Sequence, residues 1–526
     1  MIRWGLLMAV DSDFLLTALL CHNYLPTSRR DKEELPPNLS SNTFTPDVAK
    51  KLTHFKRDGV QGFDQIEYRL TRFNTAGRWL SIPHPLPHAK LCLTLSEHWD
   101  KYDRILKNTH SNIKPHRYED GRIIIMNGYS DSSEKTDKYL SHSFGNRYVV
   151  HADISNFFPS IYSHAIPWAL VGFKEAKDKS GRVHRDEWFN QIDACVRNTR
   201  RGETQGVAIG PATSNILGEI ILGKVDEALV ESANANFSRY IDDYSYYCNS
   251  EEEAQNFLHV LECELAKFKL QLNAKKTSIE KLPQPSVESW RIALGQSVSS
   301  DKEKEVPLFD VFRYLDFAQV LSAKHPEGSV LKYAVSTVIK MPIRWDKAGD
   351  LLQYLLGLSF HHINLLPLLE KPIEGNHSEI LGYGSAGSNL ISILEENIRL
   401  KRSDGICWAL YFLGRLDVEI SESVAKKIIG TDDCMSILSL YWAAEDHRQL
   451  VVAYANLIDK NHLYELDRRW MLFYQLFFDR LIENPYQADP TFGTLRDEGV
   501  SFLLDRIPYP SAFAMFTAVP QEKPSE

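Results

Sequence analysis

Residues 147–163 read RYVVHADISNFFPSIYS, and residues 237–247 read FSRYIDDYSYY. Both stretches place β-branched or aromatic residues around acidic ones, a pattern typical of strands. The first predicts a strand that runs into Asp153, and the second a hairpin with Asp242 and Asp243 near its turn. Because neighbouring carboxylates repel each other, these acids need a compensating interaction. Two bound Mg²⁺ ions would provide it, since Mg²⁺ prefers carboxylate oxygens.

The segments around these strands complete an α+β pattern. Apolar residues at helical spacing predict a long helix from Pro211 and an amphipathic helix over residues 254–272. The order strand, helix, helix, strand, helix, strand predicts an antiparallel sheet with helices packed on it. Upstream, residues 68–87 (YRLTRFNTAGRWLSIPHPLP) predict a β-hairpin whose turn is flanked by Arg72 and Arg78.

Charge and cysteine content exclude several classes of protein. The chain has 526 residues and a net charge of -9, which excludes a uniformly basic nucleic-acid coat but allows a local basic channel. Residues 182–185 and 197–201 are basic and adjoin the predicted helix. Seven cysteines without a CxxC pair predict reduced thiols in a cytoplasmic protein. No stretch approaches the ~18 apolar residues of a spanning helix, so no membrane partner is expected; the first 20 residues predict an amphipathic helix.

The second half of the chain has a different character. Beyond residues 283–307, helical periodicity dominates, and aromatic clusters recur at residues 408–411, 440–442 and 470–474. These clusters predict stacked helix pairs with the aromatic side chains in the packing core. A second acidic pair, Asp432–Asp433, follows Gly430 and Thr431 and is predicted to be a solvated loop.

Four segments in order resemble the motifs of reverse transcriptases. HADISNFFPSI (151–161) resembles motif A, TQGVAIGPATSNILGEIIL (204–222) motif B, RYIDD (239–243) motif C and LQLNAKKTSI (270–279) motif D. The hairpin at residues 68–87 resembles the fingers hairpin of these enzymes. The resemblance implies a right-hand polymerase with fingers, an antiparallel palm sheet and an all-α helical-repeat C-terminal region. The expected domains are residues 1–60, an N-terminal helical and loop segment; 61–290, fingers and palm; and 291–526, thumb and helical repeats.

The same resemblance implies roles for individual residues. Asp153, Asp242 and Asp243 match the catalytic carboxylates that bind two Mg²⁺ ions, with Mn²⁺ as a substitute. Six further residues match positions that contact the incoming nucleotide: Phe158 under the sugar, Gln205 and Gly206 beside it, Arg72 and Arg78 at the triphosphate, and Lys276 at the pyrophosphate. The implied partners are dNTPs and RNA or DNA, and a homo-oligomer fits the helical region.

The sequence of residues 153–170, DISNFFPSIYSHAIPWAL, resembles that of bacterial abortive-infection and defence-associated reverse transcriptases. That resemblance implies a role in antiphage defence, with DNA synthesis that in some members starts from a protein hydroxyl. Tyr24 is one candidate primer among 23 tyrosines. Two alternatives stay open. One is RNA synthesis on the same palm, against which Phe158 argues. The other is a vestigial palm whose helical region binds a phage or host protein.

Overall fold

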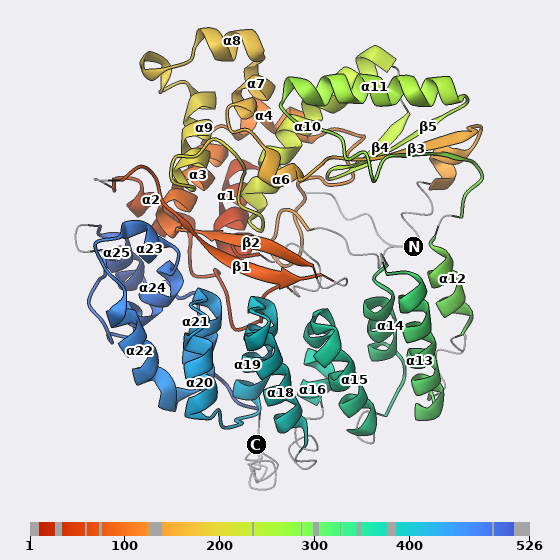
Figure 1. Cartoon of the computed structure of the whole chain (residues 1–526). Helices are drawn as coiled ribbons and strands as arrows, with labels where there is room; N and C mark the ends of the chain where they lie inside the picture. Colours follow the sequence, from red (N-terminus) through yellow and green to blue (C-terminus); the bar gives the residue numbers. More distant parts are fainter. Residues whose placement is uncertain are drawn as a thin grey trace, which may run out of the picture.

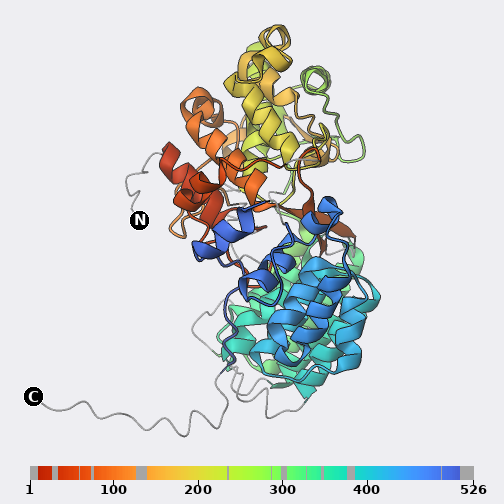
Figure 2. The same cartoon turned by 90° about the vertical axis from the view of Figure 1, so that its left-hand side faces the viewer.

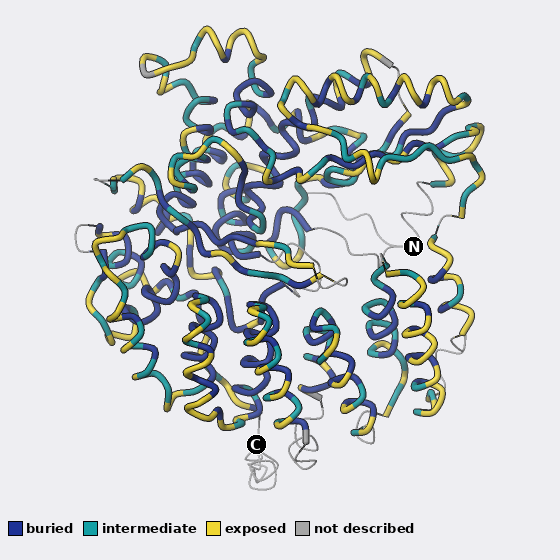
Figure 3. Tube along the Cα trace, in the orientation of Figure 1, coloured by how far each residue is buried: buried dark blue, intermediate teal, exposed yellow. Residues whose placement is uncertain are grey.

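The computed structural model describes residues 10–26, 34–57, 60–72, 76–125, 139–233, 236–285, 287–297, 305–326, 328–344, 349–375, 385–486 and 489–509. The chain forms an α+β part from its first half and a row of helices from its second half (Figures 1 and 2). Figure 3 shows that buried residues continue from α10 through the two sheets into α19 and α21, so the two parts share one core.

A four-stranded antiparallel sheet lies at the centre of the α+β part. Its strand order is β4 (Phe237–Tyr240), β5 (Asp243–Cys248), β3 (Tyr148–Asp153) and β6 (Ser278–Lys281). Helices α10 (Ala212–Ala233) and α11 (Glu251–Lys267) pack together, and α11 contacts β3 and β5. The predicted strand, hairpin and long helix are confirmed. The predicted helix over 254–272 begins earlier, because the Ser250 side chain caps α11 by accepting the Glu253 N–H, and it also ends earlier, at Lys267.

A second sheet consists of one hairpin, β1 (Gln65–Thr71) and β2 (Gly77–Pro83), as the sequence predicted. Residues 73–75 of its turn lie outside the described residues. The hairpin lies between the central sheet and the C-terminal helices (Figure 1). The remaining helices of the first half are α1 (Ser12–Thr17), η1 (Ala18–His22), α2 (Pro46–Leu52), α3 (Pro85–Glu97), α4 (Trp99–Leu106), α6 (Phe157–Ser160), α7 (Ala165–Val171), α8 (Phe173–Asp178), η2 (Arg182–His184) and α9 (Trp188–Asn198). Of the predicted N-terminal helix, residues 12–22 are helical, with a π-helical second half; residues 1–9 lie outside the described residues.

The second half of the described chain is helical. Its helices are α12 (Ser289–Gln296), α13 (Leu308–Lys324), α14 (Val330–Ile339), α15 (Gly349–His361), η4 (Ile363–Leu369), α16 (Glu370–Gly375), α18 (Ser385–Arg399), α19 (Ser403–Arg415), α20 (Glu422–Ile429), α21 (Cys434–Ala443), η5 (Glu445–His447), α22 (Arg448–Leu457), α23 (Leu463–Asp467), α24 (Trp470–Phe478) and α25 (Thr491–Asp497). Neighbours in this row pack in pairs, such as α13 with α14 and α19 with α21. The aromatic stripes are buried, so their predicted packing role is confirmed. No helix in the described ranges is long and apolar enough to cross a bilayer.

The prediction of a solvated loop at Asp432–Asp433 is confirmed for Asp432, an exposed turn residue, and is wrong for Asp433. Asp433 is the N-cap of α21, where it accepts hydrogen bonds from the Ser436 N–H at 2.7 Å and the Ser403 hydroxyl at 2.8 Å. Asp432 is ion-paired with Arg469 at 2.6 Å. Both carboxylates therefore connect helices, which residue spacing alone does not reveal.

Candidate active site

The three predicted acids meet where β3 ends and β5 begins. Asp153 is the last residue of β3 and pairs in register with Asp243, the first residue of β5. Between β4 and β5, the chain turns at Ile241 and Asp242, and the Asp242 carbonyl accepts the Ile154 N–H at 3.2 Å. The predicted position of Asp242 and Asp243 at a hairpin turn is thus confirmed, and Asp153 is beside it.

A buried ionic network holds this turn. Ile241 has a φ of 58°, a left-handed conformation that is strained for a β-branched residue. The fully buried Arg239 donates a hydrogen bond to the Ile241 carbonyl at 2.8 Å. Arg239 also forms ion pairs of 2.8 Å with Glu219 and Asp226 of α10. The sequence pattern did not single out these three residues; the available signal was Glu219, an acid within the apolar first half of α10.

Burial, and after it repulsion between neighbouring carboxylates, raises the pKa values of two residues in the acidic cluster. Burial and the nearby Asp153 raise the pKa of Asp242, while Arg78 opposes this rise. Loss of solvation and the Asp242 and Asp153 carboxylates raise the pKa of Asp243 to about 7, although the residue keeps an exposed edge. A cation placed among these carboxylates would relieve the repulsion.

Two residues of the segment after α11 hold Asp153 from the other side. The Lys276 ammonium forms an ion pair with Asp153 Oδ2 at 2.7 Å, and Asn273 Nδ2 donates to Oδ1 at 3.0 Å. The Asn273 backbone N–H also donates to the Asp153 carbonyl at 2.7 Å. The structure therefore brings the predicted Lys276 into the cluster. Asn273 was missed, because an Asn after a helix usually reads as a turn residue.

The predicted nucleotide-contacting loops pack against each other beside the acids. The Gly206 N–H donates to the Ile161 carbonyl at 2.7 Å, and the Gln205 amide donates to Pro159 and Ser160 carbonyls. Gly206 has a φ of 84°, and a side chain there would meet the Arg200 guanidinium, so glycine is required. Phe158 is 7% exposed and lies against Phe157.

The two hairpin arginines differ in position. Arg78 lies on β2, and its charge opposes the rise in the Asp242 pKa, which places it on the side of the acids. Arg72 is exposed just beyond β1 and, within the described ranges, contacts none of the three carboxylates. Tyr24, the candidate primer, is fully buried and donates its hydroxyl hydrogen to the Pro83 carbonyl, so this conformation offers no nucleophile there.

The chemistry of the three carboxylates fits a hard divalent cation. Carboxylate oxygens are preferred Mg²⁺ ligands, and the raised pKa values of Asp242 and Asp243 show that extra positive charge is favoured. In the described part of the chain, no three His, Cys, Asp or Glu side chains already surround one point. A cation bound at Asp153 Oδ2 would compete with the Lys276 ammonium for that oxygen.

Comparison with known proteins finds one family that this region resembles. Residues 99–306 match the family model described as reverse transcriptase (RNA-dependent DNA polymerase). No curated protein matches the chain. A match among solved structures is apo telomerase from Candida tropicalis truncated from its C-terminal domain, at 13% identity and a TM-score of 0.29. That match covers 46% of this chain and 55% of the telomerase chain, so the chain spans about half the length of this structure. Residues 99–306 are therefore similar to reverse transcriptases, and this region has an α+β fold that a helical C-terminal region follows.

Proposed function

We propose that the protein is a DNA polymerase that transfers a deoxynucleoside monophosphate from a dNTP to a 3′-hydroxyl or to a protein hydroxyl. The observation that supports this most is the register pair Asp153–Asp243, with Asp242 at the adjoining turn. This arrangement lies inside the region that matches reverse transcriptases. The proposed domains are an N-terminal segment (1–60), fingers and palm (61–290) and a helical region (291–526).

In this proposal, Asp153, Asp242 and Asp243 hold two Mg²⁺ ions. Such ions supply Lewis-acid polarisation of the phosphate and a lower pKa of the attacking hydroxyl. Arg78 binds the triphosphate through its guanidinium, with Arg72 at the edge of the hairpin. The attacking hydroxyl gives its proton to water, and its oxygen bonds to the α-phosphorus as the bond between that phosphorus and pyrophosphate breaks. Lys276, released from Asp153, gives a proton to the leaving pyrophosphate.

The test is an assay on purified protein with labelled dNTPs or NTPs and Mg²⁺, with and without RNA template and primer. Asp242→Asn/Asp243→Asn is expected to abolish incorporation without loss of folding, because repulsion between the carboxylates is removed. Asp186→Asn is the matched control, since that side chain is 85% exposed and remote from the acids in sequence. Incorporation that persists in the double variant would contradict the proposal. Product that is released as DNA only after protease would indicate a protein primer.

Phe158 provides a test of sugar selection. Its ring is expected to lie under the sugar, where it leaves no room for a 2′-hydroxyl. Phe158→Ala should lower the preference for dNTP over NTP by about tenfold or more, which corresponds to roughly 1.4 kcal/mol. Phe173→Ala, at an exposed phenylalanine, is the control. An unchanged preference for dNTP over NTP would show that Phe158 does not exclude the 2′-hydroxyl. RNA synthesis would then stand as an equal alternative to DNA synthesis.

We further propose that this activity serves antiphage defence in the cytoplasm, on the resemblance of residues 153–170 to defence-associated enzymes. Cells that express the protein should survive phage infection, and cells with Asp242→Asn/Asp243→Asn should not. Full protection by the double variant would instead support a scaffold role for the helical region.

A further inference from the structure

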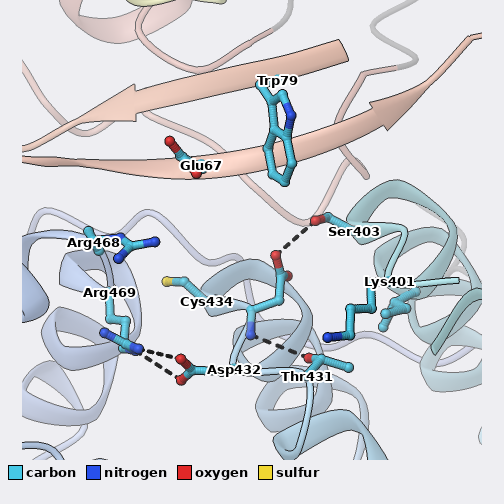
Figure 4. Close-up of a pocket in the computed structure, with 11 residues that line it drawn as sticks. Glu67, Trp79, Lys401, Ser403, Thr431, Asp432, Cys434, Arg468 and Arg469 are labelled. Atoms are coloured by element: carbon cyan, nitrogen blue, oxygen red, sulfur yellow. Dashed lines mark hydrogen bonds and ion pairs between the residues drawn. The ribbon is translucent and has the colours of Figure 1, made fainter. Parts of the chain in front are cut away.

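A cavity separates the β1–β2 hairpin from the C-terminal helices, on the side of the hairpin away from the acids. Its volume is about 190 Å³, and it is lined by Glu67 and Trp79 of the hairpin and by residues preceding or beginning α19, α21 and α24. Figure 4 shows the Trp79 ring projecting from β2 over the cavity. The charged ends of Arg468 and Lys401 point toward it from opposite sides.

The Trp79 side chain is exposed even though its hairpin packs against the C-terminal helices. Its exposed fraction is 55%, although the strand next to it is packed against α19. In the described structure, the indole takes part in no aromatic stacking and donates no hydrogen bond to protein. A bare aromatic face in a concave site is a platform on which a nucleobase can stack.

Three carboxylates and three cations line the cavity, and two of the cations have few ion-pair partners. Arg469 is satisfied by Asp432 at 2.6 Å and Glu465 at 2.7 Å. Across the described residues, the Lys401 ammonium has no ion-pair partner, and Arg468 has only Glu465 at 3.6 Å. Two cations that face a cavity from opposite sides suit a phosphate group.

Glu67 adds an acceptor on the same face of the hairpin. It lies opposite Ser81, two residues along from the pair Arg69–Trp79, so Glu67 and Trp79 are diagonal neighbours. Its carboxylate has no ion-pair partner in the part of the chain that the structure describes. A carboxylate next to a stacking platform accepts hydrogen bonds from amino groups on the edge of a base.

We propose that this cavity binds a nucleotide unit, with the base on Trp79, its amino edge at Glu67 and its phosphate between Lys401 and Arg468. The unit is either a free nucleotide or one residue of a single strand. Trp79 follows Arg78 on β2, and successive side chains point to opposite faces, so the bound nucleotide and Arg78 would lie on opposite faces of one strand. This binding goes beyond the proposed polymerase function and does not require it.

The test uses full-length protein in EDTA, so that metal-dependent binding of triphosphates at the acids is suppressed. Isothermal titration is performed with dGMP, with deoxyguanosine and with a deoxyoligonucleotide of about ten residues that carries a photoactivatable base. We expect dGMP or the oligonucleotide to bind, deoxyguanosine to bind more weakly, and the photo-crosslink to map to the peptide containing Trp79. Tighter binding of dGMP identifies a free nucleotide as the source, and tighter binding of the oligonucleotide identifies a strand.

Variants on both sides of the cavity separate binding from folding. Trp79→Leu, Lys401→Gln and Arg468→Gln should each weaken binding by about tenfold, and Trp79→Phe should retain most of it. Lys426→Gln on α20, an exposed lysine paired with Glu422, and Asp242→Asn should leave it unchanged. Absence of binding by both nucleotide probes, or equal binding by wild type, Trp79→Leu and Lys401→Gln, would overturn the proposal. Failure of Asp242→Asn/Asp243→Asn to stop synthesis would affect only the polymerase proposal.

Discussion

Arg239 shows how one buried residue can determine the position of a site that it does not enter. Its guanidinium joins the turn between β4 and β5 to α10 and holds the strained Ile241, next to Asp242. Its charge is matched by Glu219 and Asp226, so the network is favourable only when complete.

We predict that Arg239→Lys preserves the charge but loses the planar fork that reaches Ile241. The value of kcat should fall by about tenfold to a hundredfold with little change in KM, because the Asp242 turn is misplaced. The free energy of unfolding should fall by about 1–3 kcal/mol. Steady-state kinetics and urea unfolding measure the two effects, with the exposed Arg399→Lys as control. A normal kcat in a destabilised protein would show that the network serves stability alone.

His88 gives a pH dependence of stability. Burial lowers its pKa to about 3, compared with about 6.5 in the unfolded chain. The unfolded chain therefore binds an extra proton below pH 6.5, and the stability that neutral His88 contributes is lost as pH falls from 6.5 toward 3. The loss is about 1.4 kcal/mol per pH unit. His88→Gln should flatten the decline in melting temperature between pH 6.5 and 4.5, whereas the exposed His54→Gln should not.

At the scale of elements, α19 determines where the β1–β2 hairpin sits. Asp404, in the first turn of α19, accepts the Thr71 N–H at 2.6 Å and the Thr71 hydroxyl at 3.0 Å. Arg69 donates to the Leu400 and Lys401 carbonyls just before α19. Hydrogen bonds to α19 and to the residues just before it therefore hold the hairpin that carries Arg72 and Arg78.

Asp404→Asn replaces one carboxylate oxygen that accepts a hydrogen bond from Thr71. We expect the free energy of unfolding to fall by about 1–3 kcal/mol. The KM for dNTP should rise more than kcat falls, because Arg78 is displaced from the nucleotide. Denaturant unfolding and dNTP titrations test this, with Asp417→Asn at an exposed ion pair as the control. A KM equal to that of the control would show that the hairpin holds its place without α19.

At the scale of the whole molecule, the first and last parts of the chain are joined by a buried ion pair. The Arg57 guanidinium binds Asp467 through two contacts of 2.6 and 2.7 Å, with side chains 5% and 0% exposed. Asp467 also accepts the Asp64 N–H and the Tyr486 hydroxyl. Loss of one partner leaves an uncompensated buried charge.

Arg57→Met should therefore lower the free energy of unfolding by about 3–5 kcal/mol. The more exposed ion pair between Lys51 and Glu498 joins the same two parts of the chain. Lys51→Met breaks this pair and should change the free energy of unfolding by about 1 kcal/mol or less. Urea unfolding followed by tryptophan fluorescence and circular dichroism distinguishes the two. Equal losses in both variants would mean that the buried pair contributes no more than a surface contact.

The sequence by itself determined the local elements and the composition of the acidic site. The strand into Asp153, the turn at Asp242 and the helix from Pro211 follow from side-chain pattern over a few residues, and the structure has each of them. Their motifs also sufficed for the reverse transcriptase resemblance. Only the tertiary structure decided that the predicted Lys276 pairs with Asp153 and that Asn273 and Arg239 complete the site.

Tertiary structure also decided the role of the second half of the chain. Asp433 reads as a loop residue but caps α21, and Asp404 and Asp467 hold segments more than 300 residues away. Periodicity records which face of an element is apolar, whereas these contacts depend on which elements meet. That choice follows from packing the whole core, so no local stretch of sequence contains it.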